Sequence, residues 1–89
     1  MAKRGKLEII YDILKIIHNN KNSIKPTPLL RKSNLSSSRF KEYFKELIEK
    51  KLVIEKNISR EKLIAITEKG SRFLEKYKTI VSFIDEFDL

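Results

Sequence analysis

The sequence predicts a mostly α-helical α+β fold, in which three helices precede a β-hairpin and one long helix follows it. Three observations support this prediction. Apolar residues recur at helical spacing up to residue 51, this spacing is lost over residues 52–66, and it returns from residue 67 onward. Because a chain of 89 residues is long enough for only one hydrophobic core, we expect a single structural domain.

The first predicted helix runs from Leu7 to Ile17. Its polar residues form one narrow stripe and its other residues are apolar, which is typical of a helix at the centre of a domain. Residues 18–23, which follow, are rich in Asn and show no periodicity. They predict an exposed loop, and His18, the only histidine, is expected at the surface where the helix ends.

A short second helix is predicted over residues 29–32, because Thr27 followed by Pro28 is a common start of a helix, with Thr27 as the N-cap. Asn34 is the expected left-handed residue of the next turn, and Ser36 is the expected N-cap of a third helix. That helix should extend to about residue 51. Its apolar residues fall on one face: Phe40, Tyr43, Phe44, Leu47 and Ile48.

Two short strands are predicted over residues 52–54 and 63–66. The connection between them has no tight Asn-Gly turn signal, so we expect a long and mobile loop. Thr67 is the predicted N-cap of the last helix. Gly70 lies inside that helix, which indicates a close approach to the third helix or to the sheet.

The last helix carries an apolar seam that is longer than a small domain needs to cover. The seam residues are Phe73, Leu74, Tyr77, Ile80, Val81, Ile84 and Phe87. They could fold back onto their own domain or pack against a second copy of the chain, and we expect the second copy. Residues 67–89 are therefore predicted to join two chains into a homodimer.

Positive charge is concentrated in the first two thirds of the chain, whose net charge is +8. The net charge is +6 over residues 1–32, +3 over residues 33–62 and −1 over residues 63–89. Such a basic excess attracts polyanions. We therefore expect the first two thirds to meet a nucleic acid and the last third to serve another purpose.

The predicted order of elements is that of a winged helix-turn-helix, whose third helix enters the major groove of DNA. Residues 1–66 are thus expected to be a DNA-binding domain for double-stranded DNA. On the third helix, small side chains would allow close approach and cations would meet phosphates or guanine edges. The candidate residues of this helix are Ser37, Ser38, Arg39, Lys41, Glu42 and Lys45.

Further cations are expected to contact phosphates on both sides of the third helix. The candidates on the second helix and the wing are Lys25, Arg31, Lys32, Lys56, Arg60 and Lys62. Lys3, Arg4 and Lys6 are expected to form a flexible arm. The alternative for every one of these side chains is an ordinary solvated surface.

Three segments resemble the archaeal Sso-ten-a-like winged-helix family: residues 6–14 (KLEIIYDIL), residues 34–36 (NLS) and residues 66–77 (ITEKGSRFLEKY). The similarity covers nearly the whole chain. It implies a DNA-binding homodimer joined by an antiparallel coiled coil of the last helices, which gives residues 73–87 that role here. The chain differs in its short tail, which ends at Leu89.

Other classes of function find little support in the sequence. There is no cysteine, no Gly-rich phosphate loop and no second histidine, so we expect neither an enzyme nor a cofactor or metal. No apolar stretch approaches the roughly 20 residues of a membrane span, so a cytoplasmic, nucleoid-associated location is expected. A protein-interaction adaptor is the alternative function, and RNA binding is a lesser one.

Overall fold

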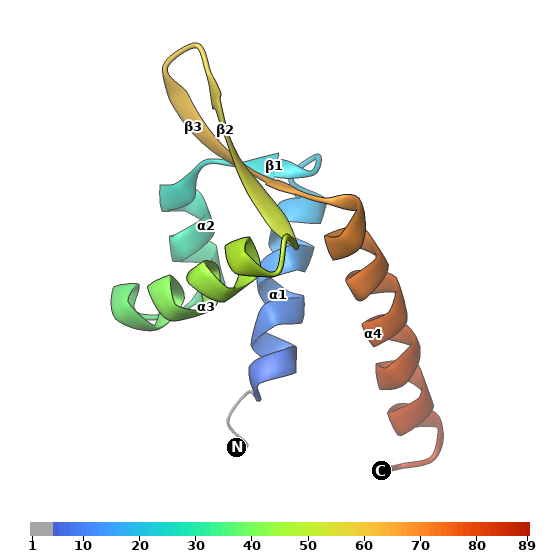
Figure 1. Cartoon of the computed structure of the whole chain (residues 1–89). Coiled ribbons are helices and arrows are strands. Elements are labelled where there is room, and N and C mark those ends of the chain that lie inside the picture. Colours follow the sequence, from blue (N-terminus) through green and yellow to red (C-terminus); the bar gives the residue numbers. More distant parts are fainter. Residues whose placement is uncertain (1–4) are drawn as a thin grey trace.

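The computed structural model describes residues 5–89, which form four helices and a three-stranded antiparallel sheet (Figure 1). The elements in chain order are α1 (Lys6–Asn19), β1 (Ser23–Ile24), α2 (Pro26–Ser33), α3 (Ser37–Glu49), β2 (Val53–Ile58), β3 (Glu61–Ile66) and α4 (Glu68–Glu86). The predicted fold class is confirmed. Helices α2 and α3 form the helix-turn-helix, β2 and β3 form the wing, and the long helix α4 comes last.

Helix α1 lies at the centre of the domain, as its composition predicts. In Figure 1 it runs between α2 and α3 on one side and α4 on the other. Its buried residues are Ile9, Ile10, Ile13, Leu14 and Ile17. They pack with apolar residues from every other helix and from the sheet, so one core holds the whole domain together.

The turn between α2 and α3 follows the predicted pattern. Asn34 is left-handed, with φ 60° and ψ 31°. The Ser36 hydroxyl accepts a hydrogen bond from the backbone N–H of Arg39 at 3.3 Å, which satisfies one free donor of the first turn of α3. This turn sets the angle at which α3 leaves α2.

Replacing Asn34 tests the importance of this left-handed residue. We expect Asn34→Ala to lower the free energy of unfolding by about 1 kcal/mol, because a Cβ without a local polar partner disfavours positive φ. Asn34→Gly should leave it within about 0.5 kcal/mol of the wild type. Urea denaturation of the two variants measures the difference, and equal stability of both would contradict it.

The predicted start of α2 is wrong by two residues. Lys25, not Thr27, is the N-cap, and the helix begins at Pro26. The ring of Pro26 fixes φ near the helical value and the first helical residue needs no amide donor, so this proline starts the helix. The backbone N–H of Leu29 then donates to the carbonyl of Lys25 at 3.2 Å.

The wing is longer and more tightly closed than predicted. Strands β2 and β3 pair from Val53 and Ile66 outward to Ile58 and Glu61. Only Ser59 and Arg60 connect them, with φ values of 50° and 68°, so the expectation of a long mobile loop is wrong. Two left-handed residues match the twist of paired strands, and the strand ladder offsets their conformational cost.

Strand β1 is a further difference from the prediction of a simple loop after α1. Its two residues, Ser23 and Ile24, pair with Ala65 and Ile64 of β3, which gives the strand order β1-β3-β2. Ile24 is 3% exposed and belongs to the core. A two-residue strand has no periodicity, so only its partner strand reveals it.

Thr67 and Gly70 hold the start of α4 against the residues that follow α3. The sequence predicted both the cap at Thr67 and a close approach at Gly70. The Thr67 hydroxyl accepts from the backbone N–H of Gly70 at 3.0 Å and donates to the carbonyl of Lys51 at 2.7 Å. A Cβ on Gly70 would collide with the carbonyl oxygen of Leu52 and lie 2.7 Å from Cγ1 of Ile66. The glycine therefore allows α4 to pack directly on backbone.

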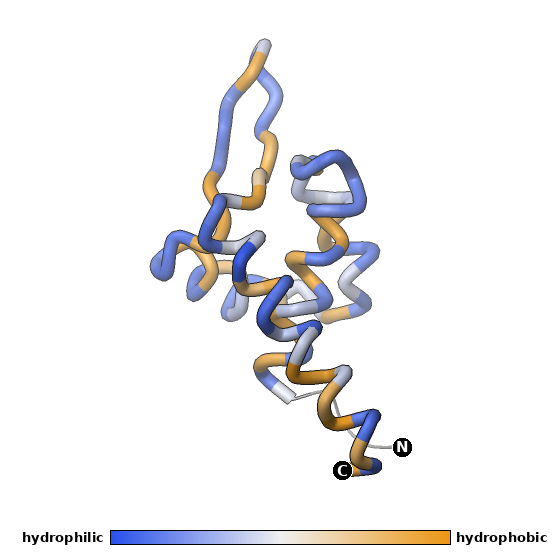
Figure 2. The backbone as a smooth tube through the Cα atoms, turned by 90° about the vertical axis from the view of Figure 1, so that its right-hand side faces the viewer, coloured by the Kyte–Doolittle hydropathy of each residue, from blue (hydrophilic) through white to orange (hydrophobic). Residues whose placement is uncertain are grey.

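The two halves of α4 have different surroundings. Phe73 and Leu74 pack against the core, and the ring of Tyr77 lies 4.9 Å from that of Tyr11. These seam residues therefore pack on their own domain, which is the alternative that the sequence left open. Hydrophobic residues continue toward the C-terminal end of α4, where Figure 2 colours the backbone orange, but these residues are exposed: Ile80, Val81, Phe83, Ile84 and Phe87.

Candidate nucleic-acid interface

Helix α3 presents a polar face to solvent because its apolar residues all turn toward the core. Phe40 and Leu47 are buried, and the rings of Phe40 and Phe44 stack with centroids 5.7 Å apart. The candidate residues of α3 are all exposed: Ser37, Ser38, Arg39, Lys41, Glu42 and Lys45. The structure thus places the predicted set together on one accessible face.

Arg39 is held along the surface of α3 by Tyr43, one turn later. Its guanidinium donates to the Tyr43 hydroxyl at 3.4 Å and lies 5.9 Å from the centroid of that ring. Tyr43 also packs on the core, so it orients Arg39 from a fixed position. The sequence prediction gave Tyr43 only a core role, although the i,i+4 spacing of the two residues was a signal for this contact.

Arg31 and Lys32 are exposed in the last turn of α2, next to the turn that leads into α3. Lys25 is also exposed, but it caps α2 rather than lying within it, and its Nζ is 3.3 Å from Oε1 of Glu61 on the wing. Arg31 and Lys32 make no ion pair within residues 5–89. The end of α2 therefore adds free positive charge beside α3.

The wing carries both free and paired cations. Lys56 and Arg60 are exposed, Arg60 at the tip, and neither makes an ion pair in the described part of the chain. Lys62 lies 3.3 Å from Oε2 of Glu55 on the neighbouring strand. The wing also has an exposed apolar feature that the sequence did not predict. Ile54 and Ile58 of β2 are 42% and 53% exposed.

The predicted N-terminal arm is corrected at Lys6, which is the first residue of α1. Its Nζ lies 2.9 Å from Oε2 of Glu46 on α3, so it joins two helices. Nζ of Lys50, one turn after Glu46 along the chain, is farther from the same oxygen, at 4.0 Å. Lys3 and Arg4, the other arm residues, lie outside the described residues.

The described residues offer neither a metal site nor a membrane-spanning helix. Residues 5–89 contain no group of His, Cys, Asp and Glu side chains that could hold a metal ion. None of the helices in this range is long and apolar enough to cross a membrane. His18 is exposed, and its Nδ1 is hydrogen-bonded to Oδ1 of Asn22 at 3.0 Å.

The arrangement of α2, α3, the wing and α4 is that of a known protein family. A family model described as winged helix-turn-helix matches residues 3–84. The chain belongs to this family. A search of curated proteins gave no significant match.

Solved structures share the fold of this winged helix-turn-helix protein over most of its length. Sso10a-2, a DNA-binding protein from Sulfolobus solfataricus, superposes with a TM-score of 0.78 at 21% identity, over 94% of this chain and 85% of that one. F93 from STIV, a winged-helix DNA-binding protein, gives 0.76 at 21% identity, over 89% and 91%. SSV1 F-93 gives 0.69 at 26% identity, over 90% and 88%. The resemblance noted in the sequence is thereby confirmed.

Proposed function

We propose that this chain binds double-stranded DNA as a homodimer and acts as a transcriptional regulator or chromatin-associated protein in the cytoplasm, at the nucleoid. Helix α3 would enter the major groove, while α2 and the wing contact phosphates on either side. Helix α4 would join the two copies. No catalytic step, cofactor or metal is part of this proposal.

The observation that carries the proposal is the unneutralised charge on the exposed face of α3. Arg39, Lys41 and Lys45 are exposed, and none of them makes an ion pair within residues 5–89. Ser37 and Ser38 lie beside them at the start of the helix. Small residues at the end that enters the groove allow close approach, and the free cations can replace the counterions of DNA phosphates.

The wing cations and Lys25, the N-cap of α2, fit the same role in two different ways. Lys56 and Arg60 would contact phosphates directly. Lys25 and Lys62 have carboxylate partners, Glu61 and Glu55, and would have to leave them for phosphates. Exposed ion pairs of this kind contribute about 0–1 kcal/mol, so the exchange costs little. Sso10a-2 and F93 from STIV, which share the fold, are both described as DNA-binding proteins.

A titration of duplex DNA at two salt concentrations tests DNA binding. On α2, α3 and the wing of one copy, the cations that make no ion pair within residues 5–89 are Arg31, Lys32, Arg39, Lys41, Lys45, Lys56 and Arg60. If about six of them meet phosphates, affinity should fall roughly 10³-fold between 50 and 200 mM salt. Fluorescence anisotropy with a labelled duplex measures it. Absence of binding at low salt, or an affinity that salt leaves unchanged, would refute the proposal.

The proposed dimer rests on the apolar side chains that α4 leaves exposed. Ile80 and Phe87 are 51% and 57% exposed, and Ile84 is 38% exposed. These residues recur on one side of the helix, which suits a second helix packed along it. The acidic residues Asp85 and Glu86 near this end would keep it away from DNA.

Ile80→Glu is expected to weaken the dimer at least 10-fold, because it places a carboxylate in the apolar contact. Thr79→Glu is the matched control, since Thr79 is an exposed neighbour at a different angle of the same helix. Light scattering behind size exclusion gives the mass of each variant. If the wild-type chain is still monomeric at roughly 100 µM, the proposed dimer is refuted.

A protein-interaction adaptor is the alternative, because the exposed apolar end of α4 would also suit a different protein. Loss of DNA affinity in α3 variants favours DNA binding. Loss of cellular function confined to variants of Val81 or Ile84, with DNA affinity unchanged, would favour the adaptor. A footprint on genomic DNA then separates a regulator, which protects few sites, from a chromatin protein, which protects many.

A further inference from the structure

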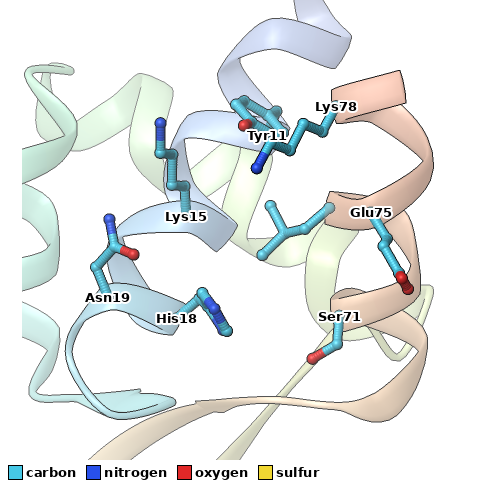
Figure 3. A pocket seen from close by; sticks show the side chains of 8 residues that line it. Tyr11, Lys15, His18, Asn19, Ser71, Glu75 and Lys78 are labelled. Atoms are coloured by element: carbon cyan, nitrogen blue, oxygen red, sulfur yellow. The ribbon is translucent and has the colours of Figure 1, made fainter. Parts of the chain in front are cut away.

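A groove between α1 and α4 is not used by the proposed function. Its volume is about 460 Å³, within the range of roughly 300–1,000 Å³ that is common for small-molecule sites. Figure 3 shows the α1 residues on one side of it and the α4 residues on the other. The lining residues are Tyr11, Lys15, His18, Asn19, Ser71, Leu74, Glu75 and Lys78.

The lining combines an apolar centre with a positively charged rim. Leu74 packs on the core and Tyr11 is half-buried, so both offer apolar surface that stays in place. Lys15 and Lys78 outnumber the single carboxylate, that of Glu75. The Lys15 ammonium lies 5.7 Å from the Tyr11 ring centroid, and neither lysine makes an ion pair within residues 5–89. This chemistry is complementary to an anion with an apolar body.

Polar groups at the far end of the groove can add orientation. Figure 3 shows the side chains of His18 and Ser71 projecting into the space between the helices. Nδ1 of His18 is already hydrogen-bonded to the side-chain Oδ1 of Asn22. The Nε2 edge is then left for a hydroxyl of a ligand. The Ser71 hydroxyl can either donate or accept.

The groove also lies apart from both proposed contact surfaces. At about 100° per residue, Leu74 and Lys78 point at least roughly 120° away from Ile80, Phe83 and Phe87 on the α4 wheel, whereas Ile84 lies about 80° from Leu74. Helix α3 lies on the other side of α1 (Figure 1). A second copy centred on Ile80 and Phe87, or DNA on α3, would therefore leave the groove open.

We propose that this groove binds a small organic anion, an aromatic or similarly flat apolar molecule that carries one carboxylate. The ring lies against Leu74 and Tyr11, and the carboxylate lies between Lys15 and Lys78. Such a ligand spans α1 and α4 and stabilises their contact. The site does not depend on the DNA-binding proposal and would stand if the chain bound no DNA.

Titration of the full chain with 2-naphthoate tests the site, with amide chemical shifts from ¹⁵N-labelled protein as the readout. We expect saturable shifts that cluster at the groove residues, with Kd on the order of 1 mM or lower for a ligand of this size. Two probes separate the contributions of charge and ring. The neutral 2-naphthamide should bind at least 3-fold more weakly, and inorganic phosphate should cause no clustered shifts.

Three single variants of exposed residues on α4 are expected to change the affinity for 2-naphthoate in three different ways. Lys78→Gln should weaken 2-naphthoate binding about 3-fold, and Glu75→Gln should strengthen it by a similar factor, since each changes one charge at the rim. Lys76→Gln, which does not line the groove, should leave Kd unchanged. Lys15→Gln combined with Lys78→Gln should weaken it about 10-fold.

Several results would overturn this proposal. Shifts scattered over the surface, or equal effects of Lys76→Gln and Lys78→Gln, would indicate general attraction to a basic protein. Equal binding of 2-naphthamide would remove the role of the lysines. Clustered binding of inorganic phosphate as tight as that of 2-naphthoate would show a simple anion site without an apolar part.

Discussion

Replacing Lys41 and Lys45 together by alanine is expected to lower DNA affinity roughly 10- to 100-fold at low salt. Both side chains are exposed on α3 and neither has a carboxylate partner in the described residues. Two lost phosphate contacts on each head should also reduce the slope of log K against log salt by about 2 per head. Anisotropy titrations at three or more salt concentrations give both quantities.

The same variant should keep its melting temperature. Lys41 and Lys45 are like charges at i,i+4, which repel each other slightly, and alanine favours the helix. Lys15→Ala with Lys78→Ala is the matched control, because it removes two charges from the groove between α1 and α4. If both double variants lose the same affinity, net charge alone attracts the DNA and α3 is not the contact surface.

Gly70→Ala is expected to lower the free energy of unfolding by about 2 kcal/mol and the melting temperature by roughly 8–16 °C. The new Cβ would overlap the Leu52 carbonyl oxygen and Cγ1 of Ile66. That carbonyl accepts hydrogen bonds from the backbone N–H of Thr67 at 3.1 Å and from its hydroxyl at 3.0 Å. Displacing it therefore disturbs the cap of α4 as well as the packing.

Alanine normally stabilises a helix by about 1 kcal/mol relative to glycine, which partly offsets the collision. The sign of the measured change thus decides whether the close approach exists. Gly5→Ala is the control, since no atom of the described residues, its chain neighbour aside, lies within 4 Å of a Cβ there. Thermal unfolding followed by circular dichroism compares the two. A Gly70→Ala variant as stable as the wild type would refute the contact between α4 and the backbone of Leu52.

Sequence patterns were most informative where many residues repeat one requirement. The buried face of α3 needs an apolar residue at every turn, so Phe40 and Leu47 fix the opposite, exposed face by geometry alone. The candidate residues Ser38 and Lys45 follow from that face. The caps Ser36 and Thr67 were also predictable, because each supplies a hydroxyl to its own helix within three residues.

Sequence patterns were least informative where a few residues depend on distant partners. Strand β1 exists because Ser23 and Ile24 meet β3, about forty positions later along the chain. Lys6 joins α1 because Glu46 faces it from α3. Neither contact leaves a local signal, because two residues are too few to show a period and a single lysine fits an ordinary exposed surface.

The sequence by itself determined the order of the helices, the left-handed turn at Asn34, the glycine contact of α4 and the basic face of α3, because each follows from local geometry or a repeated pattern. The tertiary structure alone decided which charges are free and which apolar residues are covered. Within residues 5–89, Lys62 is paired whereas Lys56 is not, and Phe73 packs on its own domain whereas Phe87 does not. The physical reason is that pairing and burial depend on where two elements meet or diverge in space, and composition does not encode that position.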